Sequence, residues 1–306
     1  MTSGHVSLPA AIRDRGSPVH EYLSGRYGAG LRGVQRGYRR SAPELAVPPR
    51  GGPAGTVATA ADWLLRFLLH PAPDLDLVLA GARACGRAGL DVQDAVAALT
   101  RRLGLPGPLA PAPVRWFTGP AAGSAAEPGL LARACWSFAL LTEAYRAGPR
   151  ILRRSSPLGR LRGQAVSDDD LLALAPGNAL AELAGLRAVF GGRLLPALAA
   201  RPGRWALGPV FAAGPLTADA DLVASGLLLR LKVTVNRGLA ADEVFGLVGC
   251  ALLDAGDEYA IRDVALFSGR TGQLAEWGLA DLLSRLAGQP VSVPAARAEF
   301  QHVLRG

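Results

Sequence analysis

Residues 219–234 read DADLVASGLLLRLKVT, and this stretch decides the fold. An acidic residue precedes a short apolar run, and a longer apolar run follows. Between them, Ser225-Gly226 has the residue types of a tight hairpin turn. We therefore predict two antiparallel strands over 221–224 and 227–235.

The second strand of this hairpin carries polar side chains on one face. Because side chains alternate along a strand, Arg230, Lys232 and Thr234 share that face. Charged side chains between apolar runs are costly unless their face lines a site. Lys232 is the only lysine of the chain, whose other 32 basic residues are arginines. A compact ammonium group whose pKa shifts with burial suits chemistry that a guanidinium does poorly, which favours a function for Lys232. The alternative is that a single lysine is retained by chance.

Outward from the hairpin, the pattern alternates between helices and strands. A long helix is expected over 178–200, with a kink at Gly191-Gly192 and Pro196. Further strands and helices are expected over 205–213 (strand), 241–254 (helix), 259–268 (strand), 273–277 (short strand), 279–287 (helix) and 294–304 (helix). The resulting order is α-β-β-β-α-β, which is typical of an α/β domain with a central mixed sheet.

This order and its motif resemble the PD-(D/E)XK nuclease superfamily, in its RecB-like branch. There, D-L-V, a hairpin and (D/E)-x-K-T precede a helix carrying Q-x-x-x-Y. Asp221 falls on the metal-binding Asp, Lys232 on the Lys and Thr234 on the following Thr, and the resemblance covers about 179–277. It implies that Asp221 helps to hold Mg²⁺, that the metal activates water for attack on phosphorus, and that Lys232 positions this water.

The chain departs from the superfamily pattern at three positions. Arg230 stands where the second acid is expected, and Gly246 and Cys250 replace the Gln and Tyr of the helix. A guanidinium brings positive charge to the place where Mg²⁺ would sit. Arg230 and Lys232 together suit a phosphate better than a metal ion.

Other acids could restore the missing ligand. Glu243 begins the helix that follows the hairpin, Asp219 precedes it, and Glu182 lies on the long helix before it. If the protein cleaves nucleic acid, we expect Asp221 to hold Mg²⁺ with help from Asp219 or Glu243. Each of these acids is equally typical of a solvated surface position.

The charge is unevenly distributed along the chain. Residues 1–165 hold 21 arginines against 10 acids, whereas residues 166–306 hold 12 basic and 15 acidic residues. We predict a basic, mainly helical region over 1–166 and the nuclease-like domain over 167–306. A basic half suggests a polyanionic partner, but a solvated surface rich in arginine has the same composition.

The N-terminal region is expected to be helical outside two loops. Helices are predicted over 56–70, 74–88, 91–104 and 128–147. The Pro-rich segment 105–127 is predicted to be a linker or long loop. The second loop, 148–166, is predicted to contact nucleic acid through five arginines, unless it is only a solvated linker: Arg150, Arg153, Arg154, Arg160 and Arg162.

A second basic segment lies near the N-terminus. Arg32, Arg36 and Arg40 are spaced to share one helix face. They could grip phosphates while Tyr27 or Tyr38 stacks on bases. Alternatively, this is a surface helix whose tyrosines pack inward.

The remaining composition argues against several classes of protein. The cysteines, Cys85, Cys135 and Cys250, are scattered in apolar surroundings, which is typical of buried thiols rather than of a metal site. The first residues lack the features of a signal peptide, and no apolar run has the length of a membrane span. We expect a cytoplasmic, bacterial protein with no membrane partner.

Two hypotheses follow from the sequence. In the first, a nuclease-fold protein binds nucleic acid and, if Mg²⁺ is held, cleaves it as a phosphodiesterase. In the second, the fold is a non-catalytic scaffold or interaction protein in a bacterial DNA-processing or defence system. Substrate, strandedness and oligomeric state are left open.

Overall fold

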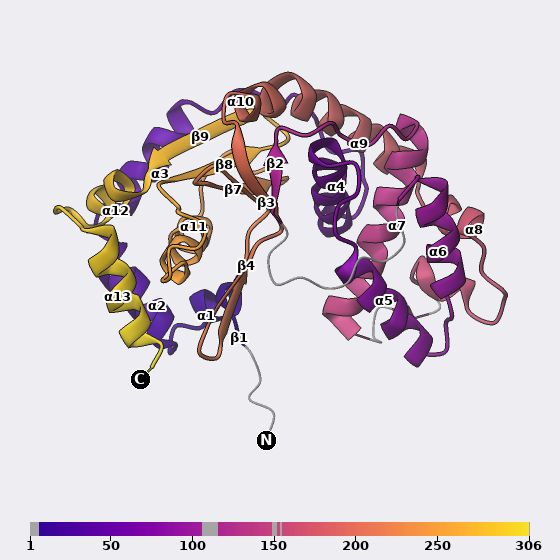
Figure 1. Ribbon diagram of the computed structural model, residues 1–306, viewed down its shortest axis with the longest axis horizontal. Helices are drawn as coiled ribbons and strands as arrows, with labels where there is room; N and C mark the ends of the chain where they lie inside the picture. Colours follow the sequence, from indigo (N-terminus) through magenta and orange to yellow (C-terminus); the bar gives the residue numbers. More distant parts are fainter. Residues whose placement is uncertain (1–5, 106–115, 149–151, 154, 306) are drawn as a thin grey trace.

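The computed structural model describes residues 6–105, 116–148, 152–153 and 155–305. It has an α/β fold in which a central mixed sheet separates two groups of helices (Figure 1). Within the described residues the sheet has six strands, in the order β2-β3-β6-β7-β8-β9. The predicted α/β class with a mixed sheet is therefore confirmed.

The strands of the central sheet come from both halves of the sequence. Their bounds are β2 (Trp116–Gly119), β3 (Gly203–Leu207), β6 (Leu222–Ala224), β7 (Leu227–Lys232), β8 (Asp263–Ser268) and β9 (Gln273–Gly278). Neighbouring strands are antiparallel, except that β7 and β8 are parallel and are connected by helix α11 (Ala241–Leu253). A crossover helix is what a parallel pair requires.

The predicted β6–β7 hairpin is present, and its turn residues explain its tightness. Ser225 and Gly226 both have positive φ, 49° and 84°. Two consecutive positive values match the twist of the flanking strands in a two-residue hairpin. A side chain at Gly226 would also lie 2.9 Å from the carbonyl oxygen of Ala260, so only glycine fits without a shift.

One face of the sheet is covered by the middle part of the chain. Its helices are α4 (Ala54–Leu69), α5 (Asp76–Arg87), α6 (Gln93–Arg102), α7 (Pro128–Ala147), α8 (Asp168–Ala173), α9 (Gly177–Val189) and α10 (Leu195–Ala199). A π-helical turn (Phe190–Leu194) joins α9 to α10, and a short 3-10 helix, η2 (Leu158–Leu161), precedes α8. Leu229 of β7 and Phe267 of β8 point into this core.

The opposite face is covered by the two ends of the chain. Its helices are α1 (Leu8–Arg13), α2 (Pro18–Tyr27), α3 (Leu31–Arg40), α11, α12 (Leu279–Ala287) and α13 (Val293–Val303). Leu228 and Leu266, the neighbours of the residues that face the first core, point into this second core. The alternation of side chains along β7 and β8 thus supplies both cores.

Packing crosses the predicted division at residue 166. Strand β2, from the first part, pairs with β3. Near the N-terminus, the N–H of Gly30 donates to the carbonyl of Leu286 at 2.8 Å, and Gln35 donates to the carbonyl of Leu239 at 2.9 Å. The regions 1–166 and 167–306 therefore share the sheet and the second core.

Several elements differ from the prediction. The strand expected over 205–213 breaks at Gly208, and the chain instead forms a second small sheet of β1 (Val6–Ser7), β5 (Leu216–Asp219) and β4 (Val210–Ala213). Gly208 has a positive φ of 57°, which ends the strand. The predicted 105–127 loop contains strand β2, because short edge strands give little periodic signal in sequence.

Candidate functional site

Asp221 lies directly before β6 and faces the neighbouring strand. Its carboxylate accepts the N–H of Leu231 at 2.6 Å. Since Leu222 pairs with Leu229, Asp221 lies opposite Arg230. The hairpin thereby brings the predicted metal ligand next to the arginine that replaces the second acid.

The surroundings of Asp221 disfavour its negative charge. Burial and the nearby carboxylate of Asp62 raise the pKa of Asp221 to about 7, although Arg230, the Leu231 amide and Arg66 act in the opposite direction. A carboxyl group with such a pKa changes its charge near neutral pH. Shifts of this kind occur at functional sites and in buried ionic clusters.

Helix α4 contributes two charged residues that the sequence analysis missed. Arg66 donates to Asp62 at 3.0 Å, and its guanidinium lies 5.2 Å from the centre of the Trp63 ring. Arg66 is only 8% exposed. A side chain at Gly208 would collide with this guanidinium, so glycine permits the contact. An acid and an arginine four residues apart in the apolar run ADWLLRF were the signal that could have revealed the pair.

Arg230 occupies space that helix α11 leaves open. A Cβ atom at Gly246 would lie 2.7 Å from the Arg230 Nη1, so the residue that replaces the expected Gln makes room for the guanidinium. Burial lowers the pKa of Arg230, but Cys250, Asp221 and other acids raise it by more, and the group stays charged. Within the described part of the chain, its side chain makes no hydrogen bond or ion pair. The side chain is half-buried against α11, and its N–H donors have no acceptor among the described residues.

The ammonium group of Lys232 is buried and is hydrogen-bonded to other residues of the chain. Lys232 is 4% exposed, and its Nζ donates to Glu243 Oε2 at 2.8 Å and to the carbonyl of Gly238. The ring centre of Tyr38 lies 6.0 Å away. Glu243 also accepts the N–H of Ala240 at 2.7 Å at the start of α11. Glu243 therefore caps the start of α11 and pairs with Lys232. The Asp221 carboxylate is instead bonded to the N–H of Leu231.

The two remaining predicted acids lie elsewhere. Asp219 is exposed at the end of β5, where Arg146 of α7 lies 3.6 Å from it. Glu182 is 1% exposed and pairs with Arg270 at 2.6 Å, in the first core near the β8–β9 turn. It also accepts the N–H of Arg50, so it holds three distant segments together. Its role is structural.

The donor set around Asp221 does not fit a magnesium ion. Mg²⁺ needs several oxygen ligands in octahedral geometry, of which one or two are carboxylates. Across the described residues, no three His, Cys, Asp or Glu side chains gather in a way that could hold a metal ion. Asp62 supplies a second carboxylate near Asp221, but the guanidinium groups of Arg66 and Arg230 lie beside this pair and oppose a dication. Glu243 is bonded to Lys232.

The basic loop before α8 is only partly described. Arg150 and Arg154 lie outside the described residues. Arg153 and Arg160 are exposed, and Arg162 donates to the carbonyl of Ala88 at 2.6 Å. Within 155–166, the short helix η2 buries Leu158 and Leu161 in the first core, so this part of the loop is anchored.

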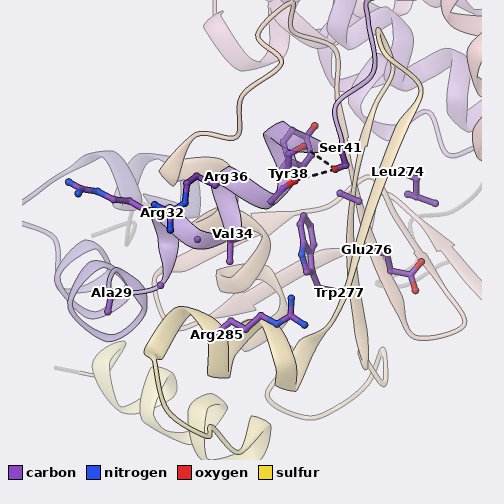
Figure 2. A pocket seen from close by; sticks show the side chains of 14 residues that line it. Ala29, Arg32, Val34, Arg36, Tyr38, Ser41, Leu274, Glu276, Trp277 and Arg285 are labelled. Atoms are coloured by element: carbon purple, nitrogen blue, oxygen red, sulfur yellow. Dashed lines mark hydrogen bonds between the residues drawn. The ribbon is translucent and has the colours of Figure 1, made fainter.

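Helix α3 resolves the alternatives left open for the N-terminal basic segment. Tyr27 and Tyr38 are 0% and 3% exposed, so they pack inward, as the second alternative predicted. Arg32 and Arg36 are exposed. They line a groove between α3, β9 and α12, together with Trp277 (Figure 2).

Comparisons of the chain with protein-family models, with curated proteins and with solved structures found no match. None of the described helices combines the length and apolar composition needed to cross a bilayer.

Proposed function

We propose that the chain is a nuclease-fold protein that binds nucleic acid through its phosphates and does not cleave it. Helix α9, the central-sheet strands β3, β6 and β7, helix α11 and strand β8 follow one another in the α-β-β-β-α-β order of the PD-(D/E)XK superfamily, which supports this proposal. Helix α10 and the strands β4 and β5 of the small sheet are inserted into this order. Asp221 directly precedes β6 and Lys232 ends β7, where the superfamily motif would have them. The finer assignment to the RecB-like branch rests on the sequence motif alone.

The state of Arg230 carries the proposal. Its guanidinium takes the position of the second acid, keeps its charge and makes no hydrogen bond or salt bridge within the described residues, although nearby groups, among them Asp221 and Asp219, raise its pKa. A planar guanidinium whose donors are not used by other residues suits a phosphate, which accepts two parallel hydrogen bonds. The same charge opposes a metal ion beside Asp221, so binding is favoured over cleavage.

Salt-dependent binding tests the phosphate contact. We expect the full chain to bind labelled DNA or RNA with an affinity that falls steadily as salt rises. Arg230→Gln should weaken binding roughly tenfold and reduce the salt slope by about one phosphate contact. Arg87→Gln removes the same charge from an exposed site on α5 and serves as the matched control. Fluorescence anisotropy measures both quantities.

Cleavage is tested on the same substrates with Mg²⁺ or Mn²⁺. The proposal predicts intact substrate after incubation with the full chain. Metal-dependent cleavage that disappears in Asp221→Asn would show an active nuclease instead. A chain that binds no nucleic acid at low salt would contradict the binding function itself.

An apolar groove favours the scaffold as a second candidate. It lies between α4, α7 and α9 and has a volume of about 630 Å³. Leu64, Leu68 and Leu183 line its floor, and Arg133 and Arg187 lie beside them. This combination suits an amphipathic partner helix with acidic residues at its edge. A synthetic acidic amphipathic peptide should then raise the Tm of the parent protein, and Arg187→Glu should abolish that effect.

A further inference from the structure

The groove between α3, β9 and α12 has the size of a ligand site. Its volume is about 880 Å³, within the range of pockets that bind small molecules or segments of a polymer. It lies next to Lys232 but outside the Asp221 cluster. Tyr38 separates them, since its side chain lines the groove and its ring lies 6.0 Å from the Lys232 Nζ. None of the residues discussed for the nuclease motif line it.

The groove carries unbalanced positive charge. Arg32 and Arg36 project from α3 and Arg285 from α12, and all three are exposed. No described carboxylate forms an ion pair with any of them. Glu276 is the single acid among the described lining residues, but it pairs with Arg201, and Figure 2 shows it pointing away from the α3 arginines. The electrostatics therefore favour a polyanion.

Two glycines keep the α3 side of the groove open. Gly33 and Gly37 lie one helical turn apart in α3, where each costs about 1 kcal/mol relative to alanine. A Cβ atom at either position would meet no atom within 4 Å, and neither glycine has a positive φ. Packing and backbone conformation thus give no reason for glycine at these positions. Because Gly33 and Gly37 line the groove, the absence of side chains there leaves space for a ligand to approach the α3 backbone.

Trp277 provides an aromatic surface in the groove. Figure 2 shows its indole standing between α3 and the guanidinium of Arg285. The side chain is half-buried, because it also packs beside Leu266 and Leu282 in the second core. The anchored ring therefore presents a fixed surface to the open side of the groove. Bases stack on such rings with little dependence on sequence.

We propose that this groove binds single-stranded nucleic acid, with a base against Trp277 and phosphates at Arg32, Arg36 and Arg285. The inference deepens the proposed function and rests on it for the class of ligand. Bases inside a duplex are stacked on each other and are closed to an indole, whereas single-stranded bases are free. The glycine strip of α3 gives the backbone of the strand its close approach.

The test distinguishes three effects on binding: loss of the aromatic contact, loss of open volume in the groove, and unfolding of the protein. Binding of the full chain to a fluorescein-labelled oligothymidine and to a duplex of equal length is measured by anisotropy. Trp277→Ala removes the ring, and Trp277→Phe keeps a stacking surface. Gly37→Leu fills the groove without changing charge, and Gly25→Leu is its matched control. Gly25 is an exposed glycine of helix α2 that does not line the groove, and a Cβ atom there would also meet no atom within 4 Å.

We expect Trp277→Ala and Gly37→Leu to weaken binding of the single strand by roughly 10- to 100-fold. Trp277→Phe and Gly25→Leu should stay within about threefold of the parent protein. Leucine is a better helix former than glycine, so Gly37→Leu should not lower the Tm, and its effect on binding cannot then come from unfolding. The oligothymidine should quench tryptophan fluorescence in the parent protein, and this quenching should fall in Trp277→Phe.

Three results would overturn the inference. If the parent protein binds the single strand and Gly37→Leu binds it equally well, the groove is not the site, while the proposed function stands. If the duplex binds as tightly and responds to the same variants, the ligand class is wrong. If the parent protein binds neither oligonucleotide, the proposed function fails together with the inference.

Discussion

Asp221 is a carboxyl group whose charge opposes folding at neutral pH. Burial and the charge of Asp62 raise its pKa to about 7, whereas an aspartate in an unfolded chain has a pKa of about 3.9. Between these values the folded chain binds more protons than the unfolded chain. The free energy of unfolding should therefore fall as pH rises from about 4 to 7, opposite to the effect of an aspartate with a depressed pKa.

Replacing Asp221 by Asn should remove this pH dependence. The amide oxygen of Asn can still accept the N–H of Leu231 but carries no charge. We expect Asp221→Asn to raise the free energy of unfolding by about 2 kcal/mol at pH 8 and to leave it unchanged at pH 4. Urea unfolding at the two pH values measures the difference. The same change at exposed Asp219 should alter neither value by more than about 1 kcal/mol, and an equal gain in both variants would refute the explanation.

The sequence predicts part of this site and misses the rest for a physical reason. The predicted hairpin correctly places Asp221 beside the strand that carries Arg230 and Lys232, because a tight hairpin pairs residues that are close in the sequence. The contribution of Asp62 and Arg66 depends on helix α4, more than 150 residues away in the chain. No local pattern encodes that contact. The partners that determine the charge of the site are therefore set by tertiary packing.

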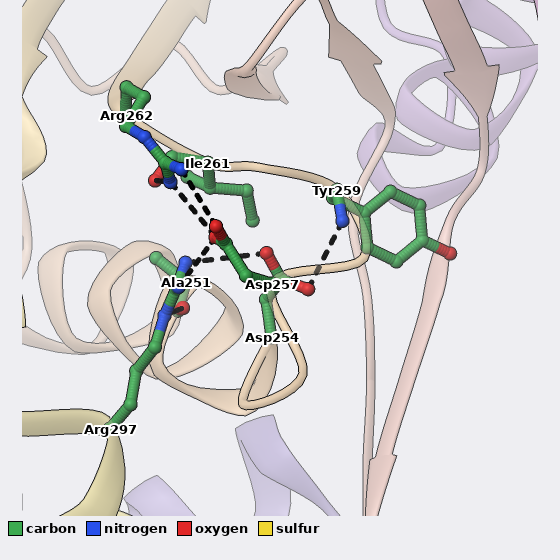
Figure 3. Close-up of polar contacts among 7 residues, drawn as sticks. All are labelled: Ala251, Asp254, Asp257, Tyr259, Ile261, Arg262 and Arg297. Atoms are coloured by element: carbon green, nitrogen blue, oxygen red, sulfur yellow. Dashed lines mark hydrogen bonds and ion pairs between the residues drawn. The ribbon is translucent and has the colours of Figure 1, made fainter. Parts of the chain in front are cut away.

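At the scale of elements, a partly exposed charge network fixes the connection between α11 and β8 (Figure 3). Asp257 accepts two hydrogen bonds from Arg262, at 2.8 and 2.7 Å, and one from Arg297 of α13 at 2.7 Å. Arg297 also reaches Asp254, whose carboxylate accepts the N–H of Tyr259 at 3.2 Å. One arginine thus ties the C-terminal helix to the loop that leads into the parallel strand.

Asp257 should make stability depend on pH in the acid range. Its hydrogen bonds with Arg262 and Arg297 lower its pKa, so its contribution is complete above about pH 4 and is lost as pH falls below that value. Asp257→Asn keeps the backbone, because Asn tolerates the positive φ of 53° at this position. We expect a loss of about 1 kcal/mol at pH 7 that shrinks toward pH 3, measured by urea unfolding. Glu258→Gln is the control, and an equal loss at pH 7 and pH 3 would contradict an ionic origin.

Elements with strong periodicity are predictable here, and short ones are not. The helix expected over 128–147 matches α7, because its apolar and capping signals are local. Strands β3 and β4 were predicted as one strand, since the break at Gly208 needs the positive φ that only the structure reveals, and β5 was missed. The extended Trp116–Gly119 becomes a strand only because β3 lies beside it. Edge strands are defined by their partner more than by their own residues.

At the scale of the whole molecule, one sheet serves two cores built from interleaved parts of the chain. Figure 1 shows the first and last helices together on one side of the sheet and the middle helices on the other. The N-terminal strand β1 pairs with β5, and helix α2 contacts α13 through Tyr22, whose ring lies 5.5 Å from that of Phe300. Neither half of the sequence therefore closes a core alone. The two halves differ in net charge, but this difference does not mark two separately folded domains.

The interleaving predicts that residues 167–306 do not fold as an isolated fragment. That fragment lacks β2 beside β3, α4 over the first face of the sheet, and α1–α3 over the second. Its exposed apolar surface should give ANS binding and no cooperative unfolding transition, measured by circular dichroism during heating. Co-expression with residues 1–166 should restore a cooperative transition close to that of the intact chain, because the covalent link at 166 is a small part of the packing. A fragment that unfolds cooperatively on its own would instead establish residues 167–306 as an independent domain, and the shared cores would then be an interface between two folded units.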